Sequence, residues 1–84
     1  MNQIDKEEIL NDVSAIMRTL FADENLCISA NTTPADISAW DSFENINLLV
    51  LVEAKFHVRF DMQKIADLTN VGDIVNAVAE KLKL

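Results

Sequence analysis

The chain has 84 residues, 50% of them hydrophobic, and carries a formal net charge of −7. This length favours one domain over residues 1–84, near the smallest size at which an apolar core is stable without disulfides or metals. The negative charge opposes binding to nucleic acid and to anionic membranes. Basic patches on other proteins are therefore the expected partners.

One cysteine and one histidine limit the chemistry that the chain supports. Cys27 has no partner for an internal disulfide, and we expect it to be a small packing residue rather than a reactive thiol. With His57 it cannot supply the usual spacing of metal ligands. Because the sequence shows no secretory leader and no long apolar span, we expect a cytoplasmic protein.

Apolar residues recur at steps of three and four along most of the chain, which predicts an all-α fold. We expect helices over residues 5–22, 42–56, 62–67 and 71–83, of which the third is short. Residues 23–40 are rich in turn formers and predict a long loop that its own apolar side chains hold in place. The expected inward side chains are Ile9, Leu10, Val13, Ile16, Met17, Leu20, Leu26, Ile28, Ile37, Trp40, Ile65, Leu68, Val71, Ile74, Val75, Val78 and Leu82.

The start of the second helix is the most informative part of the sequence. Asp41 is a good N-cap residue, and Glu44 three positions later completes a pattern like a capping box. Ser42 then occupies the first helical position, where unpaired amide groups and the positive end of the helix dipole favour an anion. Residues 48–52 are apolar around more than one face of this helix, so we expect part of it to be exposed or to face a partner.

These residues resemble the acyl carrier protein family. The resemblance extends over nearly the whole chain and comprises residues 40–43, then Ile46, Leu49, Glu53 and Phe56, then residues 58–61, and finally residues 70–74. It implies a four-helix bundle with a long loop between helices 1 and 2 and a short third helix. It also implies that Ser42 carries a 4′-phosphopantetheine arm, and that Asp41 helps the modifying enzyme to dock.

A member of this family is a carrier and not an enzyme. By resemblance, a phosphopantetheinyl transferase, with Mg²⁺ in its own site, attaches the arm from coenzyme A, which makes the product a phosphoprotein. The carrier then holds acyl or aminoacyl groups as thioesters and delivers them, as a monomer, from a loading enzyme to a downstream synthase or transferase. The residues expected to contact these partners are Phe43, Glu44, Asn47 and Glu53.

Several positions depart from the common family pattern. Phe43 replaces the usual leucine after the serine, and His57 stands where a glycine often ends the second helix. Carriers of fatty acid biosynthesis are typically acidic along this helix, whereas here mainly Glu44 and Glu53 supply the charge. The residues around Trp40 look more like those of stand-alone carriers in specialised pathways, such as polyketide or nonribosomal peptide biosynthesis.

Alternatives stay open for several of these residues and for the function. Phe43 is either a core residue or a partly exposed one, and Glu53 is either a partner contact or a solvated carboxylate. An acidic helical adaptor without a covalent cofactor would use the exposed part of the second helix to dock in a partner's groove. A hydrolase built on Ser42 and His57 is disfavoured, because the predicted helix places about 20 Å between them. No EF-hand loop is present that would make the chain a Ca²⁺ sensor.

Overall fold

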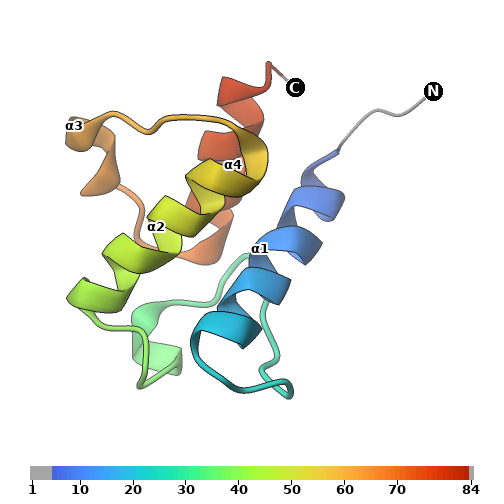
Figure 1. The fold of residues 1–84 in the computed structure, drawn as a ribbon, viewed down its shortest axis with the longest axis vertical. Helices are drawn as coiled ribbons and strands as arrows, with labels where there is room; N and C mark the ends of the chain where they lie inside the picture. Colours follow the sequence, from blue (N-terminus) through green and yellow to red (C-terminus); the bar gives the residue numbers. More distant parts are fainter. Residues whose placement is uncertain (1–4, 84) are drawn as a thin grey trace.

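The computed structural model describes residues 5–83. Within them the elements are the helices α1 (Lys6–Leu20), α2 (Ser42–Phe56), α3 (Met62–Ile65) and α4 (Val71–Lys81), with a single 3₁₀ turn, η1 (Pro34–Asp36), between α1 and α2. The predicted all-α four-helix bundle is confirmed, and the described residues contain no strand. The long loop passes the end of the bundle at which α1 stops and α2 and α4 begin (Figure 1).

Three of the four helices begin at a side chain that accepts a hydrogen bond from the first turn. The carboxylates of Asp5 and Asp41 accept from the backbone N–H groups three residues later, at 2.9 and 2.8 Å. The side-chain oxygen of Asn70 does the same for Asp73 at 2.7 Å. Each cap satisfies an amide that the helix itself leaves unpaired, which explains why α2 and α4 begin where the sequence predicts.

Three predicted boundaries were wrong. α1 ends at Leu20 rather than at residue 22, because the chain turns into the left-handed region at Ala22, where φ is 53°. α3 ends at Ile65 rather than near residue 67, and the residues after it form single turns. α4 ends at Lys81, so Lys83 lies beyond its last turn.

The 3₁₀ turn η1 was also missed, within the segment expected to be loop. Proline occupies its first position, and the Asp36 carboxylate accepts from the backbone N–H of Thr33 at 2.9 Å. The reciprocal pair of caps is a local signal that the sequence does contain.

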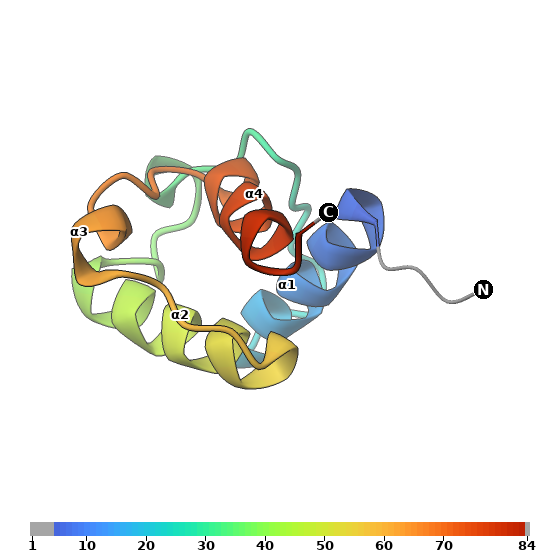
Figure 2. The same ribbon diagram turned by 90° about the horizontal axis from the view of Figure 1, so that it is seen from above.

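The core lies among α1, α2 and α4, with α3 on the side of the bundle away from α1 (Figure 2). Most of the apolar positions expected to be inward are buried, while Leu10, Ile16, Leu20, Leu26, Ile28, Ile65, Leu68 and Leu82 are partly buried against them. The buried core residues are Ile9, Val13, Met17, Ile37, Trp40, Leu48, Leu49, Val52, Phe56, Phe60, Val71, Ile74, Val75, Val78 and Ala79.

The long loop is tied to both α1 and α4. Arg18 donates from Nε to the carbonyl oxygen of Leu26 at 3.0 Å. The backbone N–H of Val71, at the start of α4, donates to the carbonyl oxygen of Thr32 at 3.0 Å, and Thr32 is itself buried. The burial of Ile37 and Trp40, with Leu26 and Ile28 partly buried, confirms that apolar side chains of the loop hold it in place, and these hydrogen bonds add to them. No helix among the described residues is long and apolar enough to cross a membrane.

Candidate functional site

Ser42 is the first residue of α2, as the sequence predicts, and its side chain is exposed. The preceding Asp41 takes an extended backbone, and its carboxylate accepts from the N–H of Glu44 at 2.8 Å. Within residues 5–83, no protein group accepts a hydrogen bond from the N–H of Ser42 or of Phe43. Two amides at the positive end of a fifteen-residue helix are therefore directed to solvent beside the Ser42 hydroxyl.

The first turn of α2 is fixed against the core by Trp40. This side chain is only 2% exposed, and its indole Nε1 donates to Oδ1 of Asn45 at 2.9 Å. A pocket of about 310 Å³ lies between this indole and the serine. Its walls come from the loop, α2 and the segment after α3, and the lining residues are Pro34, Trp40, Asp41, Ser42, Asn45 and Leu68.

The alternatives for Phe43 are resolved by its position. Its side chain is 72% exposed, whereas Leu49, six residues further along the helix, is buried. Ile46 is also exposed. Within residues 48–52, Val50 and Leu51 are exposed as well, which confirms the expectation that part of this apolar run lies outside the core.

The polar residues expected to contact partners make bonds within the protein. Asn47 donates from Nδ2 to Oε1 of Glu44 at 2.8 Å, and both residues are half-buried. Glu44 therefore does not complete the predicted capping box, because its side chain is not bonded to the N–H of Asp41. Oε2 of Glu53 accepts from the backbone N–H of Phe60 at 2.8 Å, so this carboxylate is not simply solvated. Their contacts with partners stay a prediction.

His57 ends α2, as expected, and lies at the opposite end of this helix from Ser42. It adopts a left-handed conformation with φ 57° and ψ 45°, and its N–H donates to the carbonyl oxygen of Glu53. At about 1.5 Å per residue, α2 separates the two side chains by roughly 20 Å. The structure does not bring them together as a catalytic pair.

Cys27 corrects the sequence interpretation. We expected a packing residue, but the thiol is exposed, and it donates a weak hydrogen bond to the carbonyl oxygen of Asn25 at 3.9 Å. Its apolar neighbours Leu26 and Ile28 are partly buried instead. Among residues 5–83, no three acidic, histidine or cysteine side chains are placed to bind a metal ion.

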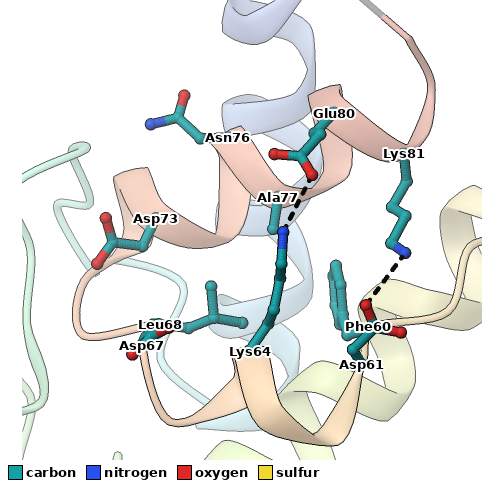
Figure 3. A pocket seen from close by; sticks show the side chains of 10 residues that line it. All are labelled: Phe60, Asp61, Lys64, Asp67, Leu68, Asp73, Asn76, Ala77, Glu80 and Lys81. Carbon is teal, nitrogen blue, oxygen red and sulfur yellow. Dashed lines mark hydrogen bonds and ion pairs between the residues drawn. The ribbon is translucent and has the colours of Figure 1, made fainter.

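A second pocket, of about 280 Å³, separates α3 from α4 (Figure 3). Phe60, Leu68 and Ala77 supply its apolar walls. Two exposed ion pairs cross its rim, from Lys64 to Glu80 at 3.2 Å and from Lys81 to Asp61 at 3.9 Å. Leu68 also lines the pocket beside Ser42, so the two pockets share this residue.

Comparison with solved structures shows to which family this arrangement belongs. The chain is similar to the holo acyl carrier protein from Geobacter metallireducens, known from a solution NMR structure. The TM-score is 0.83 and the sequence identity 33%, over 89% of this chain and 86% of that chain. The chain belongs to the acyl carrier protein family. No family model matches the sequence, and no curated protein matches it.

As an acyl carrier protein, the chain has the role of a carrier and not of an enzyme. Its partners are enzymes of pathways that handle acyl groups. This role explains why Ser42 and His57 lie at opposite ends of α2, since a carrier presents a group to the catalytic machinery of other proteins.

Proposed function

We propose that Ser42 is the attachment point of a 4′-phosphopantetheine arm. The observation that carries this proposal is the exposed hydroxyl at the first position of α2, next to two amides without a protein acceptor. A phosphodiester at this oxygen lies where amide N–H groups and the helix dipole stabilise negative charge. The pocket beside Trp40 adds room for the atoms next to the phosphate. The similarity to a holo acyl carrier protein supports the same assignment.

Asp41 and Ser42 have different roles in the attachment of the arm. Asp41 fixes the start of α2 and remains exposed, so it is available to the modifying enzyme as well. In the transfer, the Ser42 oxygen forms a bond to the phosphorus that bears pantetheine in coenzyme A. The bond from that phosphorus to the nucleotide breaks, the nucleotide leaves as its bisphosphate, and a base of the transferase takes the hydroxyl proton. The arm supplies the thiol on which cargo is held.

The cargo is an acyl or aminoacyl group held as a thioester. A long arm keeps that group at a high local concentration near each enzyme that binds the carrier. We place the protein in a specialised pathway of the polyketide or nonribosomal peptide type, because α2 has few acidic residues and Phe43 follows the serine. We further propose a monomeric cytoplasmic protein in which residues 1–84 form one carrier domain.

Intact-mass spectrometry tests the attachment. Incubation with a phosphopantetheinyl transferase of broad specificity, coenzyme A and Mg²⁺ should raise the mass of the protein by one phosphopantetheinyl group. Ser42→Ala should abolish the gain. Ser38→Ala, which removes an exposed serine outside the helix start, should leave it unchanged. A wild-type protein that stays unmodified with several transferases would contradict the proposal.

An adaptor without a covalent cofactor is the second candidate, and the exposed apolar side chains of α2 are the observation that favours it. The two functions differ in their dependence on Ser42. An adaptor requires only the surface of α2, so Ser42→Ala would bind the partner and support the pathway as the wild type does. A carrier with the same substitution binds but delivers no cargo.

A further inference from the structure

Two adjoining hollows form a groove along α1, which we call the α1–α2 groove. The first, of about 500 Å³, lies between α1 and the second half of α2. The second, of about 750 Å³, lies between the end of α1 and the start of the long loop. Ala15 and Thr19 line both hollows. α4 lies on the inner side of α1 and α2, in the core (Figure 2), so the groove opens on the outer side of the bundle.

The part of the groove between the two helices combines large apolar side chains with small ones. Ile16 is half-buried, and Leu51 is 43% exposed. The neighbouring positions carry Ala15 on α1 and Ala54 on α2, which are both exposed. Small side chains on two packed helices allow the backbone of a third helix to approach closely. Because the groove covers two turns of α1 and continues past its end, it fits a helix of about three turns.

The two ends of the groove differ in charge. At the loop end, Asp23 and Glu24 are exposed, and the guanidinium of Arg18 is hydrogen-bonded to a backbone carbonyl of the loop. Because α1 and α2 run in opposite directions (Figure 1), Asp12 and Lys55 lie together at the other end, and neither forms an ion pair within residues 5–83. The loop end therefore attracts cations, while the other end offers Lys55 to an anion.

These charges indicate the direction of a bound helix. Helices commonly carry acidic side chains in the first turn and basic ones in the last, because of the helix dipole. A helix of this kind pairs its acidic first turn with Lys55 and its basic last turn with Asp23 and Glu24 when it runs parallel to α1. A second copy of this chain is a poor occupant, since the net charge of −7 opposes its approach.

The groove faces away from Ser42. Leu51 follows Ser42 by nine positions, which places it about 180° around α2 and about 14 Å further along the helix axis. A partner in the groove therefore leaves the Ser42 hydroxyl and the first turn of α2 uncovered. Such a partner stays bound while an enzyme acts at the other face of the helix.

We propose that the α1–α2 groove binds an amphipathic helix of a partner protein, parallel to α1, with its apolar face on Ile16 and Leu51. This helix tethers the carrier to the partner and leaves the Ser42 end free. The binding needs no group on Ser42, so the inference goes beyond the proposed function and does not depend on it.

A synthetic peptide of about 18 residues serves as the probe, because shorter isolated helices are marginal in water. It carries leucines at steps of three and four, glutamates in the first turn, lysines in the last turn and alanines elsewhere. The matched peptide has the lysines first and the glutamates last. Each is titrated into the full ¹⁵N-labelled chain, and the shifts of the backbone amides give the binding site and the Kd.

Three variants of the protein locate the contact. Leu51→Gln removes a large apolar side chain of the groove, and Ala15→Glu places a charge in it. Val50→Gln is the matched control, an exposed position of α2 about 100° around the helix from Leu51. All three positions are exposed and the new residues are good helix formers, so the fold should be kept, which circular dichroism checks.

We expect the first peptide to shift amides of α1 and of the second half of α2. Leu51→Gln and Ala15→Glu should each raise its Kd about tenfold, as central contacts do, while Val50→Gln leaves it unchanged. The peptide with reversed charges should bind more weakly. A saturating amount of the first peptide should leave the rate of mass gain with a transferase and coenzyme A unchanged.

Other results would overturn the inference. These are a peptide that does not bind, one that binds all three variants alike, equal binding of the two peptides, or amide shifts confined to Phe43 and Ile46. A bound peptide that blocks the mass gain would refute the separation of the groove from Ser42. A protein that binds the peptide but is never modified would contradict the attachment at Ser42 alone and leave the groove assigned.

Discussion

The backbone N–H of Gly72 donates to the carbonyl oxygen of Ala30 at 2.8 Å, so the long loop lies directly on the first turn of α4. A Cβ atom at position 72 would lie 2.9 Å from that oxygen and 3.2 Å from the Cβ of Ala30. The close approach of two backbones leaves no room for a side chain. Glycine is needed here for space and not for an unusual φ angle, since residue 72 is helical.

Gly72→Ala should therefore destabilise the protein, although alanine is the better helix former. The helix propensity favours alanine by about 1 kcal/mol, while overpacking against a neighbour costs about 1 to 3 kcal/mol. We expect a net loss of up to about 2 kcal/mol in the free energy of unfolding, measured by urea titration with circular dichroism. Asn76→Ala, at an exposed position of the same helix, should be neutral or slightly stabilising. A variant at position 72 as stable as the wild type would show that the loop moves aside.

The bond between Trp40 and Asn45 should contribute to stability as a coupled pair. Asn45→Ala leaves a buried indole N–H without its acceptor, at a cost of about 1 to 3 kcal/mol in the free energy of unfolding. In the background of Trp40→Phe, which has no such donor, the same substitution should cost about 1 kcal/mol less. A double-mutant cycle by urea unfolding measures this difference. Additive effects would mean that the bond contributes nothing in solution.

Asp73 should make the stability depend on acid pH. The N–H and the hydroxyl of Thr69 donate to its carboxylate at 3.0 and 2.9 Å, and these bonds hold the pKa of Asp73 below its ordinary value of 3.8. Because the folded state has the lower pKa, this stabilisation is complete above 3.8 and is lost as the pH falls through the folded value.

Asp73→Asn should then lower the free energy of unfolding at neutral pH, and its difference from the wild type should shrink below pH 3.8. Urea unfolding at a series of pH values measures both effects. Asp67→Asn removes the same charge from an exposed carboxylate that accepts no hydrogen bond within residues 5–83, and it should not reproduce the loss at neutral pH. A difference that is constant across the whole pH range would exclude the carboxylate as its cause.

His57→Gly should stabilise the end of α2. The left-handed conformation of residue 57 costs a non-glycine residue about 1 to 2 kcal/mol, and glycine avoids this cost. Glycine also has the greater conformational entropy in the unfolded state, which cancels part of that gain in stability. We expect a gain of about 1 kcal/mol in the free energy of unfolding. His57→Ala keeps the strained backbone and should show no such gain. If both variants behave alike, the imidazole and not the backbone determines the effect.

The parts of the fold that the sequence predicted are those with local signals. α2 begins after Asp41 and α4 after Asn70, because each cap and the backbone N–H that donates to it lie within one turn. α3 begins after Asp61, as predicted, but its end was missed, because its contacts are distant in sequence. Asp61 makes no capping bond there, and its carboxylate lies 3.9 Å from Lys81 on α4.

The candidate site also has one part that local sequence signals predict and another that depends on contacts distant in sequence. The place of Ser42 at the start of a helix follows from neighbouring residues, and it was predicted. The pocket beside it takes walls from Pro34 in the loop and Leu68 after α3, which only the folded chain brings together. Likewise the bond from Phe60 to Glu53 spans seven residues across the end of α2, and no periodicity in the sequence indicates it.

The indole of Trp40 forms one wall of the pocket next to Ser42, and the chain contains no other tryptophan and no tyrosine. The near-ultraviolet emission of the protein therefore arises from one ring, adjacent to the hydroxyl at which a partner would act. Its wavelength and intensity depend on the surroundings of that indole, of which the pocket beside Ser42 is one side. The fluorescence of Trp40 can therefore be used, without an added dye, to follow in real time whether a group occupies the pocket beside Ser42.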